Sequence, residues 1–209
     1  TAEALELALS NIEDVISADV ITNRSSSTSN GLDPWHTEVR VYGGDALEIS
    51  ERLYEVLPIN TLKSLQGGVN GTLESTTIDG GDLYGQLTIP ITRPTEVSLS
   101  ITIDLVHNSA YAGTTEVKNK IVEYIGGTTT DARSTPGLGQ GENVIVNEVE
   151  NVAEDVTGVE AVTSTLIDDN NDGTDDTTTD TDGVNVYSVD ATTVAIVDAD
   201  NITVNTTAR

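Results

Sequence analysis

Hydrophobic and polar residues alternate most regularly in residues 86–106, on both sides of a break that contains Pro90 and Pro94. A period of two indicates strands with one buried face, because successive side chains on a strand point to opposite sides. The prolines remove two ladder donors and favour extended geometry in the residues before them. We therefore expect the chain to leave one sheet near Arg93 and to enter another.

This break predicts two tandem domains, residues 1–92 and residues 93–209. The length of 209 residues is compatible with this division, since domains usually contain ~100–150 residues. If the prediction is right, Arg93 and Pro94 lie outside regular sheet, and Ile91 and Val97 lie in different hydrophobic cores.

The first half of the chain has the pattern of helix, strand, strand, helix and hairpin. Asp45 stands at the N-cap position of the second helix, with Glu48 three residues later, and Pro58 follows that helix. Gly80 and Gly81 are expected to join the two strands of the hairpin. The expected elements are a helix at 4–15, strands at 18–22 and 37–42, a helix at 46–57, a Gly-rich turn at 62–71, and strands at 72–79 and 84–92.

The second half is expected to contain a strand, two helices and further strands. Gly126 is expected to end the first of these helices, Asn143 to cap the second, and Gly158 to end it. The whole pattern predicts an α+β fold with two helices packed on a mostly antiparallel sheet in each domain. The expected elements are strands at 97–106, 159–167, 184–189, 194–197 and 202–204, and helices at 117–125 and 143–156.

Charge narrows the range of partners. Nine Lys and Arg residues against 35 Asp and Glu residues give a formal net charge of −26. Nucleic acid and anionic membranes are therefore not expected as partners, since binding them requires clusters of basic residues. Such acidity is tolerated where strong salt shortens the Debye length to ~3 Å, which favours an extreme halophile as the source.

Three absences in the sequence bear on its redox chemistry, on membrane insertion and on processing. The chain has no Cys, which excludes disulfides and thiolate sites. No apolar run approaches the ~20 residues of a membrane span. The chain starts at Thr1 and contains no Met, so we expect it to be a fragment or a processed product.

The sharpest chemical signal is an aspartate-rich insert, residues 168–183, between two predicted strands. Asp168, Asn170, Asp172 and Asp176 stand at positions one, three, five and nine of a loop with Gly173 at position six. This spacing resembles that of a calcium-binding loop. Position twelve is Thr179 rather than a bidentate Glu. The insert is thus either a calcium site or an ordinary solvated turn, since Asp, Asn and Gly also form turns.

Other candidate sites lack supporting partners. His36 and His107 are far apart in the sequence and no Cys accompanies them, so they form no recognisable zinc or nucleophile motif. The serines at 25–29 and the glycines at 137–141 lack the context of a nucleophile elbow or a phosphate loop. For Trp35 we expect a partly buried side chain at a strand edge; the alternative is an anchor for a partner surface. No enzyme activity and no required cofactor are expected.

The order of these features resembles the middle and C-terminal parts of baseplate J-like proteins, the wedge components of contractile phage tails. The resemblance rests on four stretches that are spread along nearly the whole chain, from residue 23 to residue 204. Each is a short motif, and they occur in the expected order and spacing. The stretches are residues 23–45 with Pro34, His36, Glu38, Gly43 and Gly44; Arg93 to Val97; residues 124–125, 143–156 and 158–162; and residues 194–197 followed by 201–204.

The resemblance implies a non-enzymatic structural protein of the tail baseplate in a haloarchaeal virus or provirus, assembled in the host cytoplasm. The implied partners are a second wedge protein, the central hub and the first sheath or tube layer, within a symmetric ring. The extreme acidity and the aspartate-rich insert depart from the family pattern. Members of the family normally carry an additional N-terminal region, which fits the expectation that this chain is a fragment. The alternative is a secreted, calcium-stabilised binding module of a halophile.

Overall fold

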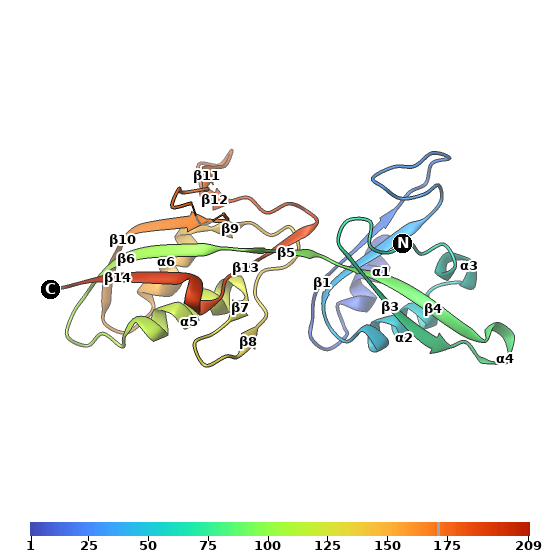
Figure 1. Cartoon of the computed structure of the whole chain (residues 1–209), viewed down its shortest axis with the longest axis horizontal. Coiled ribbons are helices and arrows are strands. Elements are labelled where there is room, and N and C mark those ends of the chain that lie inside the picture. The colour runs from blue at the N-terminus through green and yellow to red at the C-terminus, as the bar shows by residue number, and fades with distance from the viewer. Residues whose placement is uncertain (171) are drawn as a thin grey trace. The chain divides into compact units, whose positions relative to one another are not determined.

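The structure is a computed structural model that describes residues 1–170 and 172–209, except for the side chain of Leu83. The chain has an α+β architecture and divides into two compact units, Thr1–Thr95 and Glu96–Arg209 (Figure 1). We call them the first and the second unit and describe each by itself. No helix in the described part of the chain is both long and apolar enough to cross a membrane.

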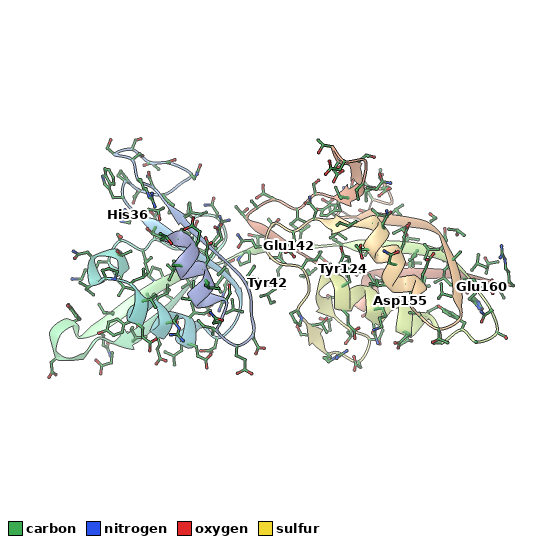
Figure 2. All side chains as sticks on the ribbon, turned by 180° about the vertical axis from the view of Figure 1, so that it is seen from behind. His36, Tyr42, Tyr124, Glu142, Asp155 and Glu160 are labelled. Carbon is green, nitrogen blue, oxygen red and sulfur yellow. The ribbon has the colours of Figure 1, made fainter. Side chains whose placement is uncertain are left out.

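The first unit is built on a four-stranded sheet with the strand order β1-β2-β4-β3. The pairs β1–β2 and β3–β4 are antiparallel, and the short β2–β4 contact is parallel. Helices α1 and α2 lie on one face of this sheet, as Figures 1 and 2 show from opposite sides. The elements are α1 (Ala2–Leu9), β1 (Val15–Thr22), β2 (Thr37–Gly43), α2 (Ala46–Val56), α3 (Ile59–Leu62), β3 (Thr72–Asp79), α4 (Gly81–Tyr84) and β4 (Gln86–Arg93).

One hydrophobic cluster fills the space between these helices and the sheet. Leu9, Ile49 and Leu53 come from the helices, and Val41 and Ile91 come from the strands; all five are fully buried. The alternation that predicted β2 and β4 is therefore the pattern of side chains that face this core.

The second unit has a central three-stranded sheet with the order β10-β6-β14. Strand β6 pairs antiparallel with β10 and parallel with β14. Helices α5 and α6 pack against this sheet around a second hydrophobic cluster. The elements are β5 (Thr95–Ser98), β6 (Ser100–His107), α5 (Thr114–Ile125), β7 (Gly127–Thr128), β8 (Ser134–Thr135), β9 (Val144–Ile145), α6 (Val146–Glu154), β10 (Val159–Asp168), β11 (Thr178–Thr179), β12 (Asn185–Tyr187), β13 (Thr193–Ile196), η1 (Ala199–Asn201) and β14 (Ile202–Ala208).

The segment around Pro94 matches the expectation in part. Ile91 belongs to the first hydrophobic cluster and Val97 packs against the second, as predicted. Pro94 lies outside the strands, but Arg93 is the last residue of β4, so its expected place outside regular sheet was wrong. Its backbone pairs with Thr72 of β3, which extends the hairpin to the residue before the proline.

Several element boundaries also differ from the predictions. Helix α1 ends at Leu9, and Val15 begins β1 instead of ending the helix. Asn143 does not cap α6, since the N-cap is Ile145 and the amide oxygen of Asn143 accepts from the backbone of Val189. Further differences include the helix α3 before the Gly-rich turn, the helix α4 between the strands of the hairpin, and the division of the expected strand 97–106 into β5 and β6. The short strands β7, β8, β9 and β11 were not predicted, and α6 ends at Glu154 rather than at residue 156.

Candidate functional site

The aspartate-rich insert begins at the buried end of β10. Asp168 is only 2% exposed, and its two carboxylate oxygens accept hydrogen bonds from the backbone of Asn170 at 3.0 Å and of Gly173 at 2.7 Å. Gly173 has φ +84°, a left-handed conformation that glycine adopts without strain. The chain therefore turns tightly around the Asp168 carboxylate.

The insert then returns to the end of β10. The backbone N–H of Asp176 donates to the carbonyl of Ile167 at 2.8 Å, and its carboxylate accepts from the backbone of Asp169 at 3.0 Å. As a result, Asp168, Asp169 and Asp176 each present a carboxylate oxygen, and these oxygens lie within 4.8 Å of one another. Oxygen ligands that share one Ca²⁺ at 2.3–2.6 Å have separations of this size.

Only two of the four predicted ligands lie in the carboxylate cluster. Asp168 and Asp176 belong to the carboxylate cluster. The side-chain oxygens of Asn170 and Asp172 instead accept from the backbone amides two residues later, those of Asp172 and Thr174. Asn171, which also lies in the predicted loop, is outside the described residues. The sequence pattern did not single out Asp169, because its place in the cluster depends on the return of the chain at Asp176.

Tyr187 on β12 also reaches this cluster. Its hydroxyl donates to a carboxylate oxygen of Asp169 at 2.8 Å. Burial raises the pKa of Tyr187 strongly, and the hydrogen bond to Asp169 and the negative charges of Asp169 and Asp176 raise it further. The tyrosine thus remains a hydrogen-bond donor to the cluster over the whole physiological pH range.

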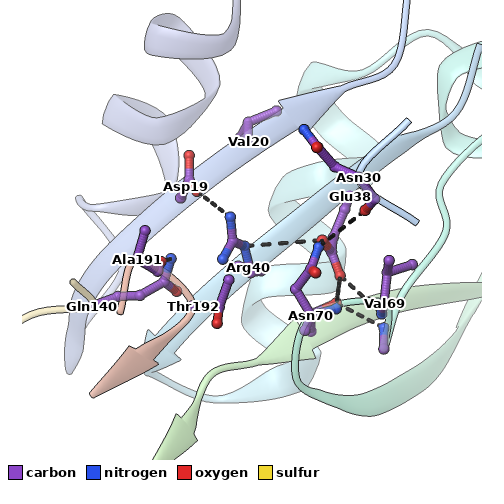
Figure 3. A network of polar contacts seen from close by, with 12 residues as sticks. Asp19, Val20, Asn30, Glu38, Arg40, Val69, Asn70, Gln140, Ala191 and Thr192 are labelled. Carbon is purple, nitrogen blue, oxygen red and sulfur yellow. Dashed lines mark hydrogen bonds and ion pairs between the residues drawn. The ribbon is translucent and has the colours of Figure 1, made fainter. Parts of the chain in front are cut away.

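A second polar centre lies inside the first unit, at Glu38 on β2 (Figure 3). The side chain of Glu38 is fully buried. One carboxylate oxygen accepts from the backbone of Val69 at 3.1 Å, the backbone of Asn70 at 3.2 Å and the hydroxyl of Thr92 at 2.7 Å. The other oxygen accepts from the side-chain amide of Asn70 at 3.0 Å. Glu38 thereby fixes the Gly-rich turn to the sheet.

Arg40 continues this network along β2. Its guanidinium forms an ion pair with Asp19 of β1 at 2.7 Å and lies 4.0 Å from the carboxylate of Glu38. Buried charges are costly unless they are paired and hydrogen-bonded, so these contacts permit charged side chains within the sheet.

Arg93 ties the end of β4 to the turn that follows β2. Its guanidinium donates to the carbonyls of Val41, Gly43 and Gly44 and forms an ion pair with Glu74 at 2.6 Å. Gly43 and Gly44 both have positive φ, and a Cβ on Gly43 would clash with the carbonyl oxygen of Asp14. The glycines therefore permit the turn whose carbonyls Arg93 holds.

The two histidines belong to different units. The ring of His36 contacts the carbonyl of Pro34 at 2.9 Å in the first unit, where Figure 2 labels it. In the second unit, His107 stacks on Tyr111 with ring centroids 4.4 Å apart. Neither histidine belongs to the metal-competent group found among the described residues.

Trp35 does not have the partly buried position expected for it. Its side chain is 63% exposed, and its backbone has φ +65°. The first unit therefore presents a large aromatic side chain to solvent.

Comparison with protein-family models and with curated proteins finds no match to this chain.

Proposed function

We propose that this chain is a non-enzymatic structural module of a contractile-tail baseplate, acting in the wedge ring around the tail hub of a haloarchaeal virus or provirus. The observation that carries the proposal concerns the residues on which the resemblance to baseplate J-like proteins rests. Glu38, the pair Gly43 and Gly44, and Arg93 all make contacts inside the first unit. Their side chains and carbonyls are used to fix backbone segments to one another.

This use of polar residues suits a scaffold. Glu38 and Arg93 connect the Gly-rich turn, β2, β3 and β4 through hydrogen bonds between groups far apart in the sequence. Such cross-links hold the unit in one shape, because each buried charge loses its partners if the segments move apart. A subunit of a ring needs a fixed shape so that its interfaces can close the ring.

The proposal is tested on tail particles purified from a host that carries the gene. We expect antibodies against the chain to label the baseplate end of the particles by immunogold microscopy, and the chain to co-purify with the hub and a second wedge protein. A chain that is absent from purified particles, or that labels the head or the whole tail length, would contradict the baseplate assignment.

A second candidate function follows from the carboxylate cluster of Asp168, Asp169 and Asp176. In this alternative the chain is a calcium-stabilised binding module. A cation among three carboxylates would offset their mutual repulsion and would bind only the folded loop, so Ca²⁺ would raise the melting temperature.

Calorimetric titration with Ca²⁺ and thermal melts with and without chelator test this alternative. We expect binding heat in the native chain and its loss in Asp168→Asn/Asp176→Asn. Asp180→Asn/Asp182→Asn, which removes the same charge outside the cluster, is the matched control and should keep the binding. If neither heat nor a shift in melting temperature is observed, the alternative loses its support.

A further inference from the structure

The exposed Trp35 is held in an unfavourable backbone conformation. For an L-residue the left-handed region costs about 1–2 kcal/mol, and bulky residues rarely adopt it. The backbone of His36 on the next position donates to the carbonyl of Asp33 at 3.2 Å and accepts from Asn23 at 2.9 Å. These bonds fix the chain on both sides of Trp35, so the indole is presented to solvent by a defined turn.

Two basic residues lie on the segments next to this turn. Arg24 directly follows Asn23, whose backbone N–H donates to the carbonyl of His36. Lys63 directly precedes Ser64, whose carbonyl accepts from the backbone of Thr37 at 3.0 Å. Both side chains are exposed, so each of the two segments whose backbone bonds to His36 or Thr37, directly after Trp35, carries one exposed cationic residue.

These two residues differ from the other basic residues of the chain. Of the nine Lys and Arg side chains, six form ion pairs, and Lys118 donates to the carbonyl of Ala199. Arg24 and Lys63 are the two that have neither an ion pair nor a side-chain hydrogen bond within the described residues. The two cations without such a partner thus lie on the segments that bond to the backbone directly after Trp35.

The local charge around Trp35 does not oppose the binding of a negatively charged partner. Asp33 is exposed beside Trp35, and the charge of Arg24 reaches Glu3 at the start of α1. With these two acids and two cations the region is locally neutral, whereas the whole chain has a net charge of −26. An acidic partner therefore meets less repulsion here than the average charge of the chain predicts.

We infer that Trp35, Arg24 and Lys63 form a docking surface, the Trp35 surface, for the aspartate-rich segment 168–182 of a second copy of this chain. That segment has seven aspartates and no basic residue, and most of its described residues are exposed. Tryptophan and arginine are the side chains most enriched at interface hot spots. Attraction between the two cations of this surface and the aspartates of the segment sets the orientation of the contact.

This contact is heterologous, because the Trp35 surface of one copy meets a different surface of the next. Heterologous contacts generate rings where the rotation closes. The inference therefore deepens the proposed ring function and rests on it. Its test remains separate, since a chain that enters baseplates without associating with itself would contradict only the inference.

Trp35 is the only tryptophan of the chain, so intrinsic fluorescence reports on this site alone. We expect sedimentation velocity to show association that increases with protein concentration, in KCl sufficient to screen the repulsion between two acidic chains. Over the same concentrations the Trp35 emission should shift to the blue as the indole becomes buried. A peptide of residues 168–182 should compete with the association.

Charge reversal provides the decisive variants. Arg24→Glu/Lys63→Glu should lower the association constant about tenfold or more, since it replaces two attractions by repulsions. Arg52→Glu/Lys120→Glu makes the same change in net charge at partly exposed, ion-paired sites elsewhere and is the matched control. Asp172→Asn/Asp180→Asn/Asp182→Asn should weaken association from the other side of the contact. Circular dichroism checks that each variant is folded.

Three outcomes would overturn the inference. The first is a monomer at every concentration tested. The second is an equal effect of the two charge-reversal variants. The third is a blue-shifted Trp35 emission that does not depend on protein concentration, which would place the indole against its own chain.

Discussion

Glu38 is a carboxylate without solvent exposure that accepts four hydrogen bonds from three residues of other segments. At the scale of the single residue, such a side chain determines which backbone segments stay together. Two of its donors are backbone N–H groups in the Gly-rich turn, where no strand supplies other acceptors. The position of that turn therefore depends on one side chain.

Substitution of Glu38 tests this dependence. We expect Glu38→Ala to destabilise the first unit by about 3–5 kcal/mol, because four donors lose their acceptor in a buried site. Glu38→Gln keeps one acceptor oxygen but places an NH₂ group among donors, and should cost about 1–3 kcal/mol. Urea unfolding followed by circular dichroism measures both. Glu13→Ala, at an exposed site of the same unit, should stay within about 0.5 kcal/mol of the native chain.

Tyr187 gives the second unit a dependence on alkaline pH. Its pKa is raised in the folded chain, so above the unfolded value of about 10 the unfolded tyrosine loses its proton while the folded one keeps it. The contribution to stability is therefore complete below pH ~10 and is lost as pH rises further. We expect a loss of up to about 1.4 kcal/mol per pH unit from this residue.

Tyr187→Phe should make this pH profile less steep. Tyr111 and Tyr124, whose pKa values burial also raises, keep part of the slope in the variant. Urea unfolding followed by circular dichroism, at neutral pH and above pH 10, gives the two profiles. Parallel profiles for the native chain and the variant would show that Tyr187 titrates alike in both states.

Residue spacing indicated only part of the candidate cation site. Asp168 and Asp176 were found because a calcium-loop pattern contains them. Asp169 and Tyr187 were missed, since their approach depends on the backbone bond between Asp176 and Ile167 and on the position of β12. The spacing of residues within one loop does not predict contacts with residues outside that loop, such as Tyr187.

At the scale of elements, the sequence predicted the strands and the helix cores better than the ends of the helices. The alternation in β4 and β6 corresponds to side chains that face two different clusters, as with Ile91 and Ile101. The start of α6 was wrong because Asn143 is a good cap by type, but here its amide oxygen accepts from Val189. The side chain of Asn143 thus forms a tertiary hydrogen bond instead of the helix cap that its local sequence predicts.

The cap of α2 is a helix signal that both sequence and structure support. The Asp45 carboxylate accepts from the backbone of Leu47 at 2.9 Å and of Glu48 at 3.1 Å. We expect Asp45→Ala to lower the unfolding free energy of the first unit by about 1 kcal/mol. Asp45→Asn should lose only a few tenths, since asparagine caps nearly as well. Glu51→Ala, on the exposed face of α2, controls for the loss of charge, and an equal loss in Asp45→Asn would contradict the capping explanation.

At the scale of the whole molecule, the net charge of −26 predicts that salt stabilises the fold. The Debye length falls from ~10 Å at ~0.1 M salt to ~3 Å at ~1 M, so repulsion between carboxylates declines. We expect the melting temperature to rise by roughly 5–10 °C between these KCl concentrations. Sucrose at matched osmolality is the control, since it stabilises by exclusion without screening charge. An equal rise in sucrose would contradict the electrostatic explanation.

The two units have separate hydrophobic clusters, and this makes the boundary testable. Every residue of the first cluster precedes Pro94, and every residue of the second follows it. Strand β5 begins at Thr95 and pairs with β13, so a cut between Pro94 and Thr95 leaves both the β3–β4 hairpin and β5 complete. We expect fragments 1–94 and 95–209 each to unfold cooperatively in urea, because each retains a whole core.

A cut four residues earlier provides the matched control. Fragment 1–90 lacks Ile91, which is fully buried in the first cluster, and Arg93, whose guanidinium holds the carbonyls of Gly43 and Gly44. Loss of one such buried side chain costs about 2–5 kcal/mol, a large part of the stability of a small domain. Fragment 1–90 should therefore be unfolded or lack a cooperative transition. If fragment 1–94 also failed to fold, the first core would need residues beyond Pro94, and the chain would have to be treated as one folding unit.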